Sequence, residues 1–164
     1  MRKFAVLLFL VALAAVGGSP AGAAGKADAG FEKLKTLVGQ WEGKGPDGTT
    51  VTVGYELVSG GNTLMEHLSV GDMITMYHVD GSHLMLTHYC AGNNQPRMRS
   101  GGLAEDGKSL QFKFFDATNL AKPTDPHMMG LTVTFRDENH INQRWTDLNE
   151  GKEAHMVVDL ERKK

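Results

Sequence analysis

Five polar residues stand in segments of the chain that otherwise alternate between apolar and polar side chains: Glu66, Tyr77, His88, Asn142 and Arg144. Together they offer a carboxyl, a phenol, an imidazole, an amide and a guanidinium. Such a set could orient the polar end of a small molecule, and Glu66 with His88 could also serve as an acid and base pair. Which of these functions is open to them depends on the elements that position them.

Those elements are predicted to be β-strands. Short β-prone runs recur from Trp41 to the end of the chain, and turn signals rich in Gly, Asn and Asp separate them, as at residues 46–48, 60–62, 80–81, 105–107 and 149–151. About ten strands joined as neighbouring hairpins predict an all-β chain that forms a single antiparallel up-and-down β-barrel. The segments 92–96 and 115–127 break this rhythm and are candidates for the loops at the barrel mouth.

The N-terminal part differs in composition. Residues 1–24 have a basic start, an apolar run shorter than the ~20 residues of a membrane-spanning helix and a small-residue exit at Ala21-Gly22-Ala23. They predict a signal peptide, hence a periplasmic or secreted protein with no membrane span after cleavage. Residues 25–30 are expected to be a flexible lead-in to a barrel domain at 31–162, which would open with a short helix capping one end of the barrel.

Tight hairpins indicate which side chains face the barrel interior, since paired residues share a face. Two-residue loops at Gly71-Asp72 and Asp80-Gly81 would put Glu66 opposite Tyr77 and send Glu66, Tyr77, His88 and Cys90 inward with the leucines.

At the C-terminal end, a two-residue Glu138-Asn139 turn and a three-residue loop at 149–151 would send Asn142 and Arg144 inward. The same register turns Trp145 outward, which is unusual for a Trp. Arg144 could then neutralise Glu66 or wait for an anionic head group, while a satisfied core network without a ligand is the alternative interpretation.

Charge and cysteine content exclude several classes. The formal net charge is −2 and the only basic cluster is Arg162-Lys163-Lys164, so nucleic acid is not an expected partner. Cys90 is the single cysteine, and an internal disulfide is therefore excluded.

The opening motif Gly39-x-Trp41-x-Gly43-x-Gly45 resembles that of nitrobindin-like proteins, relatives of fatty-acid-binding proteins and lipocalins in the calycin superfamily. A second block, Thr87 to Cys90 followed by Asn94 to Met98, resembles an uncharacterised bacterial lipocalin-like family of exported proteins. The resemblance implies a calycin barrel whose floor is closed by Trp41. Nitrobindins bind haem through a histidine near the C-terminus, and His155 is the residue here that could match it. The nitrobindin motif continues into a Tyr-Pro pair, which this chain replaces with Pro46-Asp47-Gly48.

No cofactor, metal site or catalytic residue is predicted from the chain. A patch of Met and His would suit copper, but its spacing matches no closed metal motif; it comprises Met65, His67, Met76, His78, His83 and Met85.

We therefore expect an exported barrel that holds a small, largely apolar or amphipathic molecule, an acid among the candidates, with Glu66, Tyr77, His88, Asn142 and Arg144 around its polar end. Two alternatives stay open. One is an isomerase- or hydrolase-like enzyme with Glu66 or His88 as acid/base, and the other is a structural or partner-binding barrel with a filled interior.

Overall fold

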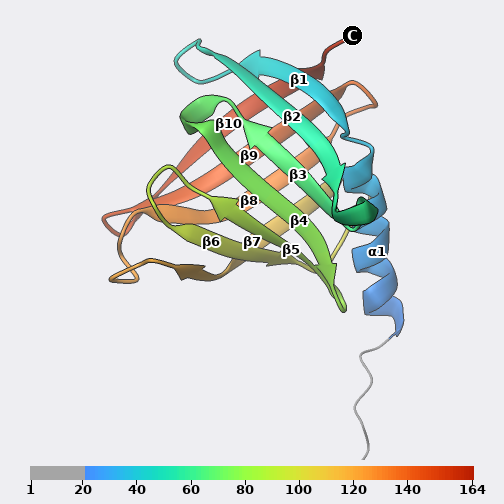
Figure 1. Cartoon of the computed structure of the whole chain (residues 1–164), viewed down its shortest axis with the longest axis horizontal. Helices are drawn as coiled ribbons and strands as arrows, with labels where there is room; N and C mark the ends of the chain where they lie inside the picture. The colour runs from blue at the N-terminus through green and yellow to red at the C-terminus, as the bar shows by residue number, and fades with distance from the viewer. Residues whose placement is uncertain (1–20) are drawn as a thin grey trace, which may run out of the picture.

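The computed structural model describes residues 21–164 and shows one helix followed by ten strands (Figure 1). The predicted signal peptide lies largely outside the described residues. The elements are α1 (Ala21–Lys35), β1 (Gly39–Lys44), β2 (Thr50–Val58), β3 (Thr63–Leu68), β4 (Met73–Asp80), β5 (His83–Tyr89), β6 (Gln95–Ser100), β7 (Ser109–Thr118), β8 (His127–Phe135), β9 (His140–Asn149) and β10 (Lys152–Arg162), with single 3-10 turns at Ser59–Gly61 and Val70–Asp72.

The strands form a closed antiparallel barrel in which every strand pairs with its neighbours in sequence. Closure comes from β1, which pairs with β2 on one side and β10 on the other. The predicted all-β up-and-down barrel is confirmed. The turn residues explain the meander, because Gly and Asp occupy positions with positive φ, such as Gly81 (φ 57°) between β4 and β5 and Gly151 (φ 76°) between β9 and β10.

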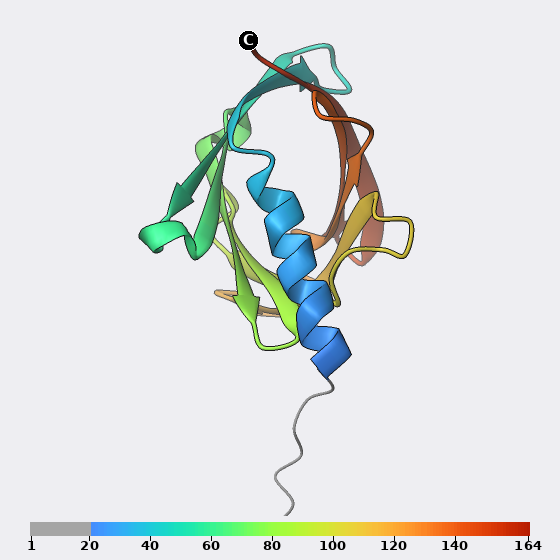
Figure 2. The same cartoon turned by 90° about the vertical axis from the view of Figure 1, so that its right-hand side faces the viewer.

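Helix α1 lies across one end of the barrel (Figure 2). It buries Ala27, Phe31 and Leu34 against the strand ends, so the expected capping helix is present. The helix includes residues 25–30, and the expectation of a flexible lead-in there is wrong. The reason is close packing: a Cβ added to Gly102, in the β6–β7 turn, would lie 2.3 Å from the Lys26 carbonyl oxygen. Within the described residues, no helix has the length and apolar character needed to cross a bilayer.

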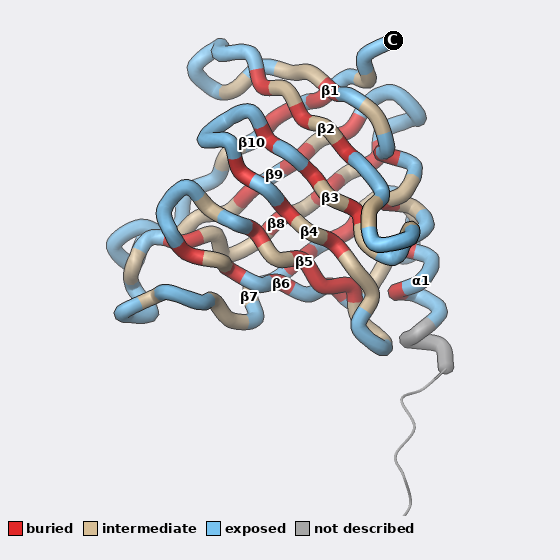
Figure 3. Tube along the Cα trace, viewed as in Figure 1, coloured by how far each residue is buried: buried red, intermediate tan, exposed pale blue. Residues whose placement is uncertain are grey.

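Buried and exposed residues alternate along the strands (Figure 3). On β3, β4 and β5 the predicted interior face is confirmed, since Glu66, Tyr77 and His88 are all buried. The pairing within that face is shifted by two residues. Glu66 lies opposite Thr75, not Tyr77, because the β3–β4 connection spans residues 69–72 instead of two residues. Shifts by an even number preserve the face.

On β9 the predicted face is wrong. Asn142 and Arg144 point outward, and Ile141, Gln143 and Trp145 point inward. The β8–β9 turn has three residues between Arg136 and His140, which pairs Phe135 with Ile141. The β9–β10 loop has two residues, which pairs Arg144 with Val157. Each loop differs by one residue from the expected length, and a shift by one reverses the face.

The loops at the end opposite α1 are those at residues 90–94 and 119–126. The second is shorter than the predicted 115–127, because β7 continues to Thr118. The two loops contact each other: the Asn119 side-chain amide donates to the Asn93 carbonyl, and Asn94 Nδ2 donates to the Pro126 carbonyl at 2.9 Å. Cys90, expected inside, lies in the first loop after the end of β5 and is half-buried.

Candidate functional site

The centre of the barrel contains a buried carboxyl held by three donors. Glu66 has 0% of its surface exposed. Tyr55 Oη donates to one carboxyl oxygen at 2.7 Å, Tyr77 Oη donates to the other at 2.6 Å, and Gln143 Nε2 donates to the first. Trp145 Nε1 donates in turn to Gln143 Oε1 at 3.2 Å. All three donors come from different strands, β2, β4 and β9, so the network ties opposite walls of the barrel together.

Within residues 21–164, which the structure describes, the carboxyl has no positive partner, because no buried residue there is a Lys or Arg and Arg144 is exposed. Burial therefore raises the pKa of Glu66 above its ordinary value, and the hydrogen bonds from Tyr77, Tyr55, Gln143 and Thr75 reduce this effect. Burial and the adjacent Glu66 raise the pKa of Tyr55 and Tyr77 well above 10. Both phenols thus stay protonated and able to donate at neutral pH.

Thr75 and His88 continue the row from Glu66 across the next two strands. Thr75 lies directly opposite Glu66 on β3 and directly opposite His88 on β5. His88 Nδ1 is 2.9 Å from Thr75 Oγ1, and the His88 ring packs against Trp145 with ring centroids 4.9 Å apart. Burial lowers the pKa of His88 to about 4, so its imidazole is neutral at pH 7.

His88 Nε2 is buried and has no hydrogen-bond partner. Most buried polar atoms in proteins are bonded, and each exception calls for an explanation. A ring whose first nitrogen is fixed by Thr75 and whose second is free can bond to, or exchange a proton with, a bound molecule. His88 is therefore the residue of this row best suited to meet a ligand.

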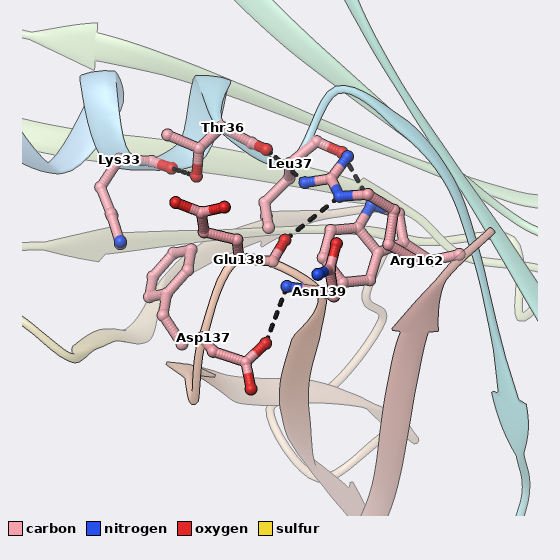
Figure 4. A pocket seen from close by; sticks show the side chains of 9 residues that line it. Lys33, Thr36, Leu37, Asp137, Glu138, Asn139 and Arg162 are labelled. Carbon is pink, nitrogen blue, oxygen red and sulfur yellow. Dashed lines mark hydrogen bonds between the residues drawn. The ribbon is translucent and has the colours of Figure 1, made fainter. Parts of the chain in front are cut away.

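The end of the barrel next to α1 is closed by Trp41 and Arg162. Trp41 is fully buried, and its Nε1 donates to the Leu37 carbonyl at 2.7 Å. The Arg162 guanidinium lies 4.3 Å from the centroid of the Trp41 ring and donates to the carbonyls of Thr36 and Glu138 (Figure 4). It also donates to the Val38 carbonyl at 2.8 Å. A surface pocket of about 540 Å³ adjoins this contact. All three guanidinium nitrogens of Arg162 donate to backbone carbonyls, so Arg162 helps to close the floor of the barrel.

Tyr55 and Gln143 line the interior but were not predicted as site residues, and the predicted Asn142 and Arg144 lie outside. Asn142 instead donates to Asp159 on the outer surface at 2.8 Å, and Arg144 is exposed. The pattern Ile141-x-Gln143-x-Trp145 carried the correct signal, because an inward Ile and Trp place Gln143 inward with them. For Tyr55, the alternation of Val51, Val53 and Tyr55 gives the same information.

The residue proposed by resemblance for haem does not fit that role. His155 lies on the outside of β10, exposed, with Nδ1 3.1 Å from Thr146 Oγ1. By strand alternation the residues of the Met and His patch lie on the outer face of the barrel, although Met85 is buried there. His67 bonds to Asp72 at 2.6 Å. In the part of the chain that the structure describes, no three or more His, Cys, Asp or Glu side chains are grouped to hold a metal ion.

Comparison of the chain with models of known protein families and with curated proteins gives no match. The class of the protein therefore rests on its fold: a closed, ten-stranded antiparallel barrel, compatible with the calycins and able in principle to enclose a small molecule.

Proposed function

We propose that this chain is an exported, lipocalin-like barrel that binds a small, largely apolar molecule in its interior. The observation that carries the proposal is the buried and unpartnered Nε2 of His88, which stands among apolar side chains and beside a carboxyl whose pKa is raised. Perturbed titratable groups inside a barrel are typical of ligand sites. Export is supported by the leader-like composition of residues 1–24.

The interior polar groups have separate roles in this proposal. Glu66, Tyr55, Tyr77 and Gln143 satisfy one another and form a rigid support. Thr75 links that support to His88 and fixes the orientation of its ring. His88 Nε2 meets the polar end of the ligand, and Trp145 supplies an apolar wall beside it. Asn142 and Arg144 have no part in it.

Native mass spectrometry of protein purified from the organism that makes it tests the proposal. We expect an additional mass that disappears on denaturation. The His88→Phe variant keeps the contact with Trp145 but removes Nε2, and should carry much less of that mass; His155→Phe, on the outer surface, is the control. An unloaded wild-type protein that also binds no compound from an extract of that organism would contradict the proposal.

One observation favours a second candidate, an enzyme that uses the same interior residues. A carboxyl, a hydroxyl and a neutral imidazole in a row, with the far imidazole nitrogen free, have the order required of a general base and its supporting groups. In an enzyme, Glu66→Gln would abolish turnover of the bound compound while leaving its binding intact. In a carrier, the compound would be recovered unchanged from both proteins.

A further inference from the structure

Three buried polar side-chain atoms without a hydrogen-bond partner occur in the described residues: His88 Nε2, Asn94 Oδ1 and His127 Nε2. Their residues are 1%, 4% and 5% exposed. All three lie at the end of the barrel opposite α1, where β5 leaves and β8 enters. Unpartnered atoms of this kind are rare, and three at one end of the barrel are an argument for a bound polar group there.

Asn94 and His127 lie at the junction of the loops 90–94 and 119–126, and His88 lies two residues before Cys90, whose N–H donates to the Asn94 carbonyl. Asn94 Nδ2 holds the Pro126 carbonyl, and His127 is the next residue along the chain. The His127 ring packs against Phe114 with centroids 4.8 Å apart. Phe114 pairs with Met98, and Met98 pairs with Leu86, two positions from His88 on the same face of β5. The His88 ring packs against Trp145. Trp145 in turn pairs with Leu131 on β8, the strand that begins at His127.

The chemistry of each atom follows from its partners. His127 Nδ1 lies 2.6 Å from the Asp125 carbonyl oxygen, which can only accept. His127 Nδ1 must therefore carry the ring proton, which leaves Nε2 of the neutral ring as an acceptor. Asn94 uses its NH₂ group on the Pro126 carbonyl, and its free atom is the acceptor oxygen.

His88 differs, because its Nδ1 faces the Thr75 hydroxyl at 2.9 Å, and a hydroxyl can donate or accept a hydrogen bond. Either tautomer of His88 fits this contact, so its Nε2 is complementary to an alcohol, which both donates and accepts.

We infer that the ligand enters through this end and is held by a head group that donates hydrogen bonds, an alcohol or an amine, to Asn94 Oδ1 and His127 Nε2, with His88 Nε2 as a further contact. The inference rests on the proposed function and names the class of ligand. A carboxylate does not fit this position, since it would set a third acceptor against Asn94 Oδ1 and His127 Nε2. The apolar body of the ligand lies against Phe114 and Trp145.

Two measurements on the mature protein test the inference. Long-range ¹H–¹⁵N spectra of the histidine rings at pH 8, with the His127 signals assigned through His127→Phe, report which nitrogen carries the proton. We expect Nδ1 of His127 to be protonated. Protonation of His127 Nε2 would overturn the inference, whatever the protein binds.

The second measurement compares octan-1-ol, octylamine and octanoate, which share one chain length and differ in the head group. Titration calorimetry at pH 8 should give binding of the alcohol or the amine at least tenfold tighter than binding of octanoate. His127→Phe should weaken that binding about tenfold, the loss expected for one hydrogen bond, and His155→Phe should leave it unchanged.

Each outcome separates the inference from the proposed function. Octanoate binding as tightly as the other two would overturn the donor head group and leave a small-molecule barrel. If none of the three compounds binds, the test is the head group of the compound that co-purifies with the protein. An alcohol or amine there would support the inference, and a carboxylate would overturn it. No binding and no co-purifying compound would overturn both.

Discussion

Thr75 lies directly opposite His88 on the neighbouring strand, and the Thr75 hydroxyl oxygen is 2.9 Å from His88 Nδ1. The contact fixes the orientation of the His88 ring but supplies no negative charge that would favour its protonated form. Burial therefore lowers the pKa of His88 to about 4. Between pH 6.5 and about 4 the unfolded chain therefore binds a proton at His88 that the folded barrel does not.

This proton linkage predicts that the stability contributed by a neutral His88 is fully present above pH 6.5 and is lost as the pH falls towards 4. The shift corresponds to a loss on the order of 3 kcal/mol. His88→Phe should flatten this part of the pH profile of guanidinium chloride unfolding, and the exposed His155→Phe should not. An unchanged slope in His88→Phe would contradict the neutral, buried ring.

Glu66 should act in the opposite direction. Its folded pKa is raised, so between pH 4.5 and that higher value the folded state holds a proton that the unfolded state has released. Stability from this group is greatest below pH 4.5 and declines as the pH rises. Glu66→Gln should remove the decline in the same unfolding series, while Glu56→Gln, at an exposed position on β2, serves as the control. A decline that persists in Glu66→Gln must come from another group.

Arg162 should contribute to stability well beyond its charge. Arg162→Met removes three hydrogen bonds to backbone carbonyls and the stacking on Trp41, and we expect a loss of about 2–4 kcal/mol in the free energy of unfolding. Lys163→Met is the matched control, since it breaks only a surface ion pair with Glu42 and should cost below about 1 kcal/mol. Equal effects of the two substitutions would mean that the floor contact is not what stabilises this end.

Gly43 permits the close approach of β1 and β10. A Cβ at this position would lie 2.1 Å from the Asp159 carbonyl oxygen, which is backbone and cannot move without disturbing the strand pair. Gly43→Ala should therefore destabilise the barrel by about 2 kcal/mol or more in thermal or denaturant unfolding. Gly101→Ala, with nothing within 4 Å, should be close to neutral, and similar losses for both would exclude a role for strand approach.

The leader can be tested by N-terminal sequencing of protein recovered from outside the cytoplasm. Cleavage after Ala23 would give a chain that begins at Ala24. Recovery with Met1 intact and only in the cytoplasm would contradict export.

The barrel and the inward position of Glu66 and His88 could be predicted from the sequence. Both depend on the alternation of side chains along each strand, which a register shift of an even number of residues leaves unchanged. Turn residues mark the ends of the strands, and an alternating strand assigns its own faces. Glu66 and His88 were placed inside even though the β3–β4 loop is longer than expected, because the shift was even.

The rest of the site depended on loop lengths that the residues did not determine. The β8–β9 turn has three residues between Arg136 and His140, one more than expected. As a result Ile141, Gln143 and Trp145 face the interior in place of Asn142 and Arg144. Burial of Trp145 is the physical reason that the observed register prevails. The contacts of His127 and Asn94 depend on how two distant loops meet, which no local pattern encodes.

The pairing of β1 with β10 also determines when the barrel can close during folding. Arg162 bonds to the Val38 carbonyl across 124 positions of chain. During synthesis β1 can pair only with β2, and its other edge stays unpaired until β10 has been made. The barrel therefore cannot close before the last strand is complete. If the chain is exported as proposed, the barrel would stay open until its last strand has crossed the membrane.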